Sequence, residues 1–312
     1  MDGLSFDIST ANTGPRALYA TVTDGLLVRD ISVNGVQDTD QGVTRFDITD
    51  PDGRGRVTRM RIPDGGAPGT LSTGCLVGPR SEGELTLTDC HIARFPDNGL
   101  YGSPAPGAVN VHGGYYANNG ISNVRVSGES EVRGVHVVCD EARKGVPNMR
   151  GIRLRDGEGA LIEDCRIELR EVTMSDGAIA LSEGMGAATV RDTAIRVDTD
   201  NVPAIRAKPP SDVPELEHRN PRLRCLNVSI LGDAAGGRAI HVVGRDRSVF
   251  ENLCVEQKGK NRHGFYFVDS RGSTVTNSEI NVTGDPIVTS NSTLTTSDLI
   301  TGGEVSCSSQ SN

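Results

Sequence analysis

The chain has 312 residues and a net charge of −9, and its composition excludes several classes of protein. Glycine is abundant at 38 residues, tryptophan is absent, and aromatic residues make up only 4%. No apolar run approaches the ~18 residues of a membrane span, and residues 1–24 lack the basic start and apolar core of a signal peptide. The acidic balance also argues against a nucleic-acid-binding protein, which normally carries a basic stripe.

A short pattern recurs along the whole chain in a first register. Examples are GLLVRDISVNG at 25–35, ELTLTDCHI at 84–92, GALIEDCRI at 159–167 and GSTVTNSEI at 272–280. Each places an apolar marker two residues before an Asp- or Asn-like position and five residues before a second apolar residue. The markers recur about every 27 residues and are Val28, Val57, Leu87, Val111, Val132, Ile162, Val190, Cys225, Phe250, Val275 and Leu294.

A second register of apolar, any residue, apolar segments interleaves with the first. Its markers are Leu18, Phe46, Cys75, Leu100, Ile121, Ile152, Ile179, Ile205, Ile240, Phe265 and Ile287. Short strands at this period, without helical spacing, predict an all-β fold: a single-stranded right-handed parallel β-helix of about 10–11 coils. A β-sandwich is the alternative, which the sequence repeat disfavours.

The domain organisation follows from the extent of the repeat. We expect one β-helix domain over residues 1–300 and a polar C-terminal tail over 301–312. A charged, proline-rich insertion at 207–222 interrupts otherwise constant connections. A solenoid must cap its end coils, so we expect either an upstream region that is missing here or a packing partner at the N-terminal coil.

The third position of the first register is rich in Asp, Asn and Gly. These residues tolerate left-handed backbone angles, so the position predicts a corner between two rows of strands. Stacked asparagines there also form hydrogen-bonded ladders between coils. We interpret the column as structural; its members are Asp30, Arg59, Asp89, Gly113, Gly134, Asp164, Asp192, Asn227, Asn252, Asn277 and Thr296.

Four phrases carry a resemblance to a known family. They are DPDG at 50–53, FPDNGLYGS at 95–103, GGYYANN at 113–119 and MRGIRL at 149–154. With the repeat, they make the chain resemble the right-handed parallel β-helix proteins of the pectate-lyase-like superfamily, and most closely the β-helix repeat proteins of haloarchaea. This resemblance implies a fold more than an activity, because the superfamily includes lyases, hydrolases, viral tailspikes and non-catalytic surface proteins.

Connection lengths vary on one side of the predicted coils. Two long connections, 34–45 and 63–74, precede two short ones at 93–99 and 117–120, and a long one follows at 139–151. Insertions in a solenoid collect on one face, often the binding face. The order predicts a cleft whose floor is the short pair and whose walls are the long connections.

Alternation identifies the residues that line this cleft. In the first register the marker and the sixth position face inward, so the fifth position faces outward. Five consecutive coils carry aromatic or cationic residues there, and we name this set the outward ladder: Arg61, His91, Tyr115, His136 and Arg166. At ~4.8 Å per coil it spans roughly 19 Å, enough for several sugar units.

Three further residues, Asp97, Asn98 and Tyr101, are expected beside the cleft floor. Aromatic and imidazole rings offer flat faces for stacking, and arginine offers a fork for carboxylates or sulfates. These three and the outward ladder form the predicted substrate-binding set. The alternative is a ladder that stacks only for stability.

No catalytic residue is identified. A lyase needs a base such as Arg61 or Arg166, with Ca²⁺ or cations to neutralise a uronate. A hydrolase needs two carboxylates, and Asp97 is the only one predicted at the floor. The segment 50–56 begins like a calcium loop, but its twelfth position is Arg61 instead of Glu, so we interpret it as a turn. We expect no metal site and no cofactor, with Ca²⁺ alone left open.

The function we expect is polysaccharide or glycan interaction by an extracellular, cell-surface or virion-associated protein without catalysis. A polysaccharide lyase or glycoside hydrolase acting on acidic glycans is the first alternative, and a structural spacer is the second. The seven cysteines form no CxxC pair, and we interpret them as small buried apolar residues.

Overall fold

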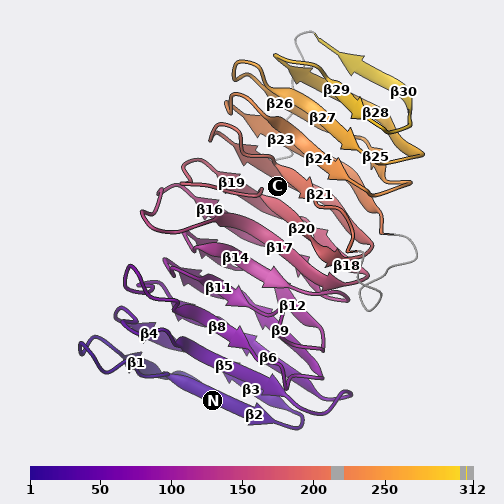
Figure 1. Cartoon of the computed structure of the whole chain (residues 1–312). Coiled ribbons are helices and arrows are strands. Elements are labelled where there is room, and N and C mark those ends of the chain that lie inside the picture. Colours follow the sequence, from indigo (N-terminus) through magenta and orange to yellow (C-terminus); the bar gives the residue numbers. More distant parts are fainter. Residues whose placement is uncertain (212–220, 303–306, 308–312) are drawn as a thin grey trace.

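The computed structural model describes residues 1–211, 221–302 and 307, and these form a parallel β-solenoid of about ten turns (Figure 1). Every strand pairing between neighbouring turns is parallel, and the described residues contain no helix. The expected all-β solenoid is therefore confirmed. Most turns consist of three short strands, and successive turns stack along the axis from the N-terminus to the C-terminus.

One side of the solenoid is an 11-stranded sheet, with one strand from each turn. In order it contains β2 (Leu18–Val22), β5 (Gly42–Ile48), β8 (Thr73–Val77), β11 (Asn98–Tyr101), β14 (Ile121–Val126), β17 (Met149–Gly157), β20 (Ile179–Met185), β22 (Ile205–Ala207), β24 (Arg238–Val243), β27 (His263–Val268) and β29 (Ile287–Ser290). This sheet contains the second sequence register.

The remaining 19 strands form a sheet that is folded along a corner into two rows. The first row contains β3 (Leu26–Arg29), β6 (Arg54–Thr58), β9 (Glu84–Thr88), β12 (Val109–His112), β15 (Glu131–Arg133), β18 (Ala160–Glu163) and β25 (Val249–Glu251). The second row contains β1 (Ser5–Asp7), β4 (Ser32–Asn34), β7 (Arg61–Ile62), β10 (His91–Ala93), β13 (Tyr115–Ala117), β16 (His136–Cys139), β19 (Arg166–Leu169) and β26 (Cys254–Gln257). Four longer strands pass through the corner and belong to both rows: β21 (Ala188–Val197), β23 (Leu223–Gly232), β28 (Ser273–Val282) and β30 (Leu294–Thr301).

The corner is a single residue in the left-handed region, as the sequence predicts for ten of the eleven positions. Its φ is +54° at Asp30, +52° at Asp164 and +57° at Asn252, and glycine fills the corner at Gly113 and Gly134. Amide hydrogen bonds between turns also occur along this column: Asn252 Nδ2 donates to Asn227 Oδ1 at 2.7 Å.

The predicted eleventh turn is out of register by two residues. Val275 pairs with Thr296 instead of Leu294, and the left-handed residue is Asp298 with φ +50°, not Thr296. In the last turn Thr296 pairs with Val275 and Thr301 pairs with Ile280, so threonine occupies two apolar columns and the apolar marker could not be located from sequence.

Two markers of the second register are also wrong, at Phe46 and Ile121. Thr44 and Val124 occupy those columns, pairing with Cys75 and Leu100 respectively. Thr44 is fully buried, and its hydroxyl donates to the Gly74 carbonyl at 3.2 Å, so a polar residue takes an interior position. The polar Thr44 explains the wrong marker at Phe46, whereas Ile121 and Val124 are both apolar residues of β14 and the pattern alone does not distinguish them.

The interior is a continuous column of apolar side chains from successive turns. Phe250 lies at the meeting point of both sheets, with its ring 5.2 Å from Phe265 and 5.5 Å from Phe267 in edge-on contact. All three rings are buried. Burial of apolar surface at about 25 cal/mol per Å² makes this column the main stabilising contribution.

Five of the seven cysteines are free and buried, as expected: Cys75, Cys90, Cys139, Cys165 and Cys225. Burial raises the pKa of the Cys75 and Cys90 thiols to about 12, so these two are inert apolar residues at neutral pH.

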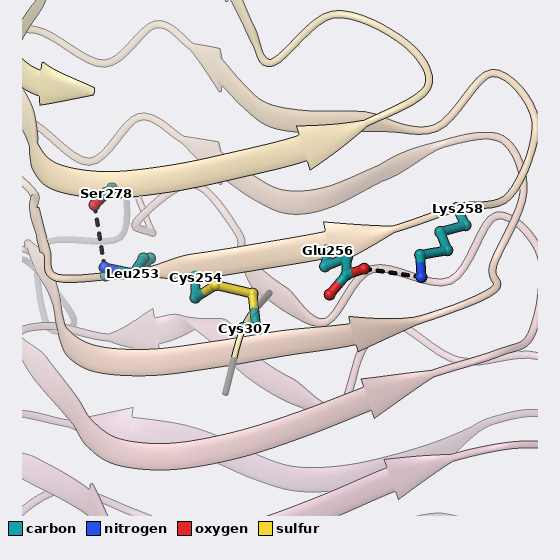
Figure 2. Close-up of a disulfide and its surroundings, with 6 residues drawn as sticks. All are labelled: Leu253, Cys254, Glu256, Lys258, Ser278 and Cys307. Atoms are coloured by element: carbon teal, nitrogen blue, oxygen red, sulfur yellow. Dashed lines mark hydrogen bonds and ion pairs between the residues drawn. A yellow bond between two sulfur atoms is a disulfide. The ribbon is translucent and has the colours of Figure 1, made fainter. Parts of the chain in front are cut away.

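The interpretation is wrong for Cys254 and Cys307, which form a disulfide (Figure 2). Cys254 begins β26 and lies in an outward column between Ser229 and Glu279, so the bond fastens Cys307 to the outside of the solenoid. β30 ends at Thr301, and most of the predicted tail lies outside the described residues. The predicted insertion between β22 and β23 also lies partly outside them, at 212–220.

Candidate functional site

The outward ladder forms one column on the second row of the 19-stranded sheet. His91 pairs with Arg61 and Tyr115, and His136 pairs with Tyr115 and Arg166, so the five residues occupy consecutive turns on β7, β10, β13, β16 and β19. Their phase is fixed because each lies two residues beyond the left-handed corner of its turn. The inward neighbours, such as Ile62 and Ile92, are buried.

The three rings of the ladder pack edge to face. The Tyr115 ring centroid lies 5.2 Å from that of His91 at 81°, and 5.3 Å from that of His136 at 73°. Such pairs contribute roughly 0.5–1.5 kcal/mol beyond simple burial, so the ladder is held rigid before any ligand arrives. The three rings are half-buried, whereas Arg61 and Arg166 are exposed at the two ends.

A buried carboxylate supports one end of the ladder. Glu168 Oε1 accepts a hydrogen bond from Arg166 Nε at 2.7 Å and lies 3.0 Å from His136 Nε2, and Glu168 Oε2 pairs with Arg170. Burial opposes the charge on Glu168, but the hydrogen bonds from His136 and Arg170 and the nearby Arg166 together hold its pKa below the ordinary value. One carboxylate thus orients two members of the ladder, while the Arg166 side chain stays 66% exposed.

The rings of His91 and Tyr115 form an uncharged stacking surface at neutral pH. Burial, together with the charge of Arg61, lowers the pKa of His91, and burial raises the pKa of Tyr115. At neutral pH His91 and Tyr115 are therefore uncharged. Arg61 and Arg166 place a positive charge at each end of the ladder.

A small apolar cluster lies two residues along from the ladder rings. Ala93, Ala117 and Val138 are buried, pack with Tyr115 and form a cluster separate from the interior. Next to it, Asn118 Nδ2 donates to Asp140 Oδ1 at 2.8 Å and fixes the start of the long connection 140–148. One wall of the predicted cleft is thus tied to the edge of the ladder.

The connection lengths follow the predicted order. The stretches 35–41 and 63–72 are long, 94–97 and 118–120 are short, and 140–148 is long again. Two hollows of the described residues lie elsewhere, one beside the Cys254–Cys307 disulfide and one near Arg206. The cleft over the short connections stays a prediction.

The structure separates Asp97, Asn98 and Tyr101 from the ladder. Tyr101 faces outward from β11 in the 11-stranded sheet, where the Arg125 guanidinium lies 4.4 Å from its ring centroid. Asn98 is fully buried, and its amide donates to Asp97 Oδ1 at 2.7 Å, so it positions Asp97 instead of facing a ligand. Burial raises the pKa of Asp97, whose other oxygen accepts from Thr73 at 3.1 Å.

Strands of the 11-stranded sheet and the residue that follows β22 carry a second set of charged residues that the sequence analysis missed. We name it the arginine face: Arg125, Arg150, Arg153, Arg206, Lys208 and Arg238. The residue after a second-register marker faces outward, as the sequence predicts for Tyr101 after Leu100, and the same rule holds in later turns of this sheet. That rule identifies Arg153, which follows Ile152, and Arg206, which follows Ile205. The two markers lie in one column, because each pairs with Ile179.

The arginine face has more cations than carboxylates. Asp176 pairs with Arg150, with Arg206 Nη1 at 2.9 Å and with Lys208 Nζ at 3.7 Å. Burial and the neighbouring Arg150 lower the pKa of Arg153 to about 10. A chain of net charge −9 thus gathers positive charge on one sheet, which favours an anionic partner there.

Two further searches concern the described residues alone. Across 1–211, 221–302 and 307, no three His, Cys, Asp or Glu residues gather in a way that could hold a metal ion. Within the same residues, no helix is long and apolar enough to cross a membrane.

Comparison with known proteins gives one distant structural similarity. No protein-family model matches the sequence, and no curated protein matches it. Among solved structures the chain is similar to the ORF18 protein of Geobacillus virus E2, with 9% sequence identity and a TM-score of 0.46. The match covers 96% of this chain and 53% of that one, so this chain spans about half its length. A similarity at this level carries no function, and membership of the pectate-lyase-like superfamily stays a prediction.

Proposed function

We propose that this protein binds acidic polysaccharide through the outward ladder and does not catalyse a reaction on it. The observation that carries the proposal is the rigid His91–Tyr115–His136 stack with an exposed arginine at each end. The spacing between turns places the two arginines roughly 19 Å apart along the solenoid. A chain of several uronate or sulfated sugars has this length and presents both ring faces and anions.

Each part of the ladder has a distinct task in this proposal. The half-buried rings present flat surfaces against which sugar rings pack. Arg61 and Arg166 donate paired hydrogen bonds to carboxylate or sulfate groups, because the guanidinium fork matches their geometry. Glu168 keeps Arg166 and His136 in place, so little conformational freedom is lost when the ligand binds.

The setting we propose is extracellular, on a cell or virion surface. The Cys254–Cys307 disulfide supports this setting, because such bonds persist mainly in oxidising compartments. The stacked parallel turns also agree with the resemblance to pectate-lyase-like β-helix proteins, some of which are non-catalytic surface proteins.

A polysaccharide hydrolase or lyase is the second candidate, and Asp97 favours it. Its pKa is raised by burial, which is the property of a general acid, and it lies at the short connection between β10 and β11. Hydrolysis also requires a second carboxylate about 5–10 Å away. Product analysis after incubation with polygalacturonate separates this candidate from simple binding, as does absorbance of unsaturated uronate with and without Ca²⁺.

Calorimetric titration with oligogalacturonates at fixed ionic strength tests the proposal. Tyr115→Ala and His91→Ala should each weaken binding about fivefold to tenfold, since each removes a stacking surface worth about 1 kcal/mol. Tyr19→Ala is the matched control, because Tyr19 is an exposed tyrosine beside Arg45 on the other sheet. Thermal unfolding checks that all variants are folded. Equal affinities for Tyr115→Ala, His91→Ala and the unmodified protein would overturn the proposal.

A further inference from the structure

A hollow of about 200 Å³ opens on the 11-stranded sheet, on a different face from the outward ladder. Its lining residues come from two neighbouring turns, and we name it the arginine hollow: Asn201, Pro203, Arg206, Arg238 and His241. Arg206 projects from β22, whereas Arg238 and His241 project from β24. Arg206 pairs in register with His241, so both side chains face the same side of the sheet.

The charges around the hollow are not balanced. Arg206 shares Asp176 with Arg150 and Lys208, so one carboxylate faces three cations. Lys208 also lies 3.3 Å from Glu183. Among the described residues, Arg238 pairs with no carboxylate; its guanidinium lies 4.9 Å from the Tyr266 ring centroid instead. The hollow therefore holds at least one cation without a counter-charge.

Ring stacking fixes the position of His241 at the hollow. The His241 ring stacks on Tyr266 from β27, with centroids 5.4 Å apart and planes at 20°. Tyr266 thus fixes both His241 and Arg238 from the neighbouring turn. Burial, with added repulsion from Arg238 and Arg206, lowers the pKa of His241 to about 4. The imidazole is neutral at pH 7, and a neutral ring still offers one N–H donor.

The rim is formed by two connections that pack closely. Asn201 has a left-handed φ of +60°, and its backbone N–H donates to the Ala235 carbonyl at 2.8 Å. Gly236 has a left-handed φ of +62°, and a Cβ there would lie 2.6 Å from Asn201 Oδ1, so glycine favours this close approach. The connections 198–204 and 233–237 are therefore fixed relative to each other, and Arg238 follows directly after the second.

We propose that the arginine hollow is a binding site for a tetrahedral oxyanion, a sulfate or phosphate group. Two guanidinium groups and one imidazole N–H approach from two neighbouring strands, β22 and β24, and this arrangement can supply donors to three oxygens of one group. A planar carboxylate has only two oxygens to accept them. The site is distinct from the outward ladder and does not rest on the proposed function.

Calorimetric titration with sodium sulfate, sodium phosphate and sodium acetate, at constant ionic strength, tests the site in the full chain. We expect saturable one-to-one binding of sulfate or phosphate and none of acetate. Arg238→Gln should weaken that binding at least tenfold. Arg206→Gln should do the same, but it also breaks the Asp176 contact, so Arg238→Gln is the cleaner variant. Arg224→Gln is the control, because it removes one exposed arginine from β23 in the other sheet.

A second arm distinguishes a free ion from an ester group on a larger molecule. A sulfated oligosaccharide that binds at least tenfold more tightly than inorganic sulfate, with the same loss in Arg238→Gln, identifies the ester as the ligand. Equal affinities identify the free ion, and both results support the site. Binding of acetate alone, no saturable binding of any probe, or unchanged affinity in Arg238→Gln would overturn the proposal. A parallel titration of Tyr115→Ala should show unchanged sulfate binding, so that failure here and failure of the proposed function are separate results.

Discussion

The two outward surfaces of this solenoid differ in how their positions are fixed. The outward ladder lies two residues beyond a left-handed corner in every turn, so its phase follows from one recognisable residue type. The arginine face follows connections of variable length, and the left-handed residues in them, such as Asn201 and Gly237, have no fixed spacing from the strand that follows. The sequence therefore predicts the ladder residue by residue, whereas on the arginine face its outward rule accounts for Arg153 and Arg206 but not for Arg150 and Arg238.

This difference shows which positions of a repeat sequence indicate the side on which the following residues face. A corner such as Asp164, with φ +52°, restricts the residue type at one position and thereby sets the side on which every following residue lies. Interior positions restrict the residue type less strictly. Thr44 shows this, because a hydrogen bond to Gly74 lets a threonine take a place that apolar residues usually occupy.

The largest expected effect tests which residues face inward on both sheets. Phe250→Ala should lower the free energy of unfolding by about 3–5 kcal/mol, because it removes a buried ring that contacts Phe265 and Phe267. Tyr266→Ala, a half-exposed residue between those two phenylalanines on β27, should cost clearly less. Urea denaturation measures both. Equal losses would contradict the inward and outward assignment.

A smaller loss of stability is expected from a substitution of the carboxylate beneath the ladder. Glu168→Gln should lower stability by about 1–3 kcal/mol, since Arg166 and Arg170 lose the charge that they share. The folded-state pKa of Glu168 lies below its unfolded value, so this contribution is present above the unfolded value and is lost as pH falls through the folded one. Unfolding measured from pH 7 to pH 3 should show a weaker acid dependence in the variant. An identical acid dependence would contradict the assigned role.

A substitution at the left-handed corner should lower stability by as much as Glu168→Gln or less. Asp164→Val should cost about 1–2 kcal/mol, because a β-branched residue is strained at φ +52°. Asp164→Gly should be nearly neutral, since glycine already fills the same column at Gly113 and Gly134. Thermal unfolding of both variants provides the comparison. A valine variant as stable as the glycine variant would remove the argument that the corner sets the phase.

The smallest effect concerns the arginine face. Burial is the main cause of the low His241 pKa, and Arg238 adds to it by repulsion. Arg238→Gln should therefore raise the pKa of His241 above about 4, while Arg224→Gln leaves it unchanged. Titration of the imidazole proton resonances by NMR measures this shift. A pKa that falls or stays constant in Arg238→Gln would contradict the positive field assigned to the hollow.

Much of the fold could be predicted from sequence, because apolar alternation and left-handed corners report backbone geometry locally. The five-residue ladder followed from that same local information. Other features depend on contacts between distant residues. The Cys254–Cys307 bond joins residues 53 apart, and Asn98 is buried through its own contact with Asp97. The contact of Tyr101 with Arg125 depends likewise on the register between neighbouring turns.

Histidine resonances followed by NMR during addition of oligogalacturonate test the central claim most directly. His91 and His136 lie in the outward ladder, and His241 lies in the arginine hollow. If the ladder binds acidic polysaccharide, the His91 and His136 signals should shift saturably while His241 responds to inorganic sulfate instead. Saturable shifts confined to His241, or no saturable shift at either ladder histidine, would contradict the account.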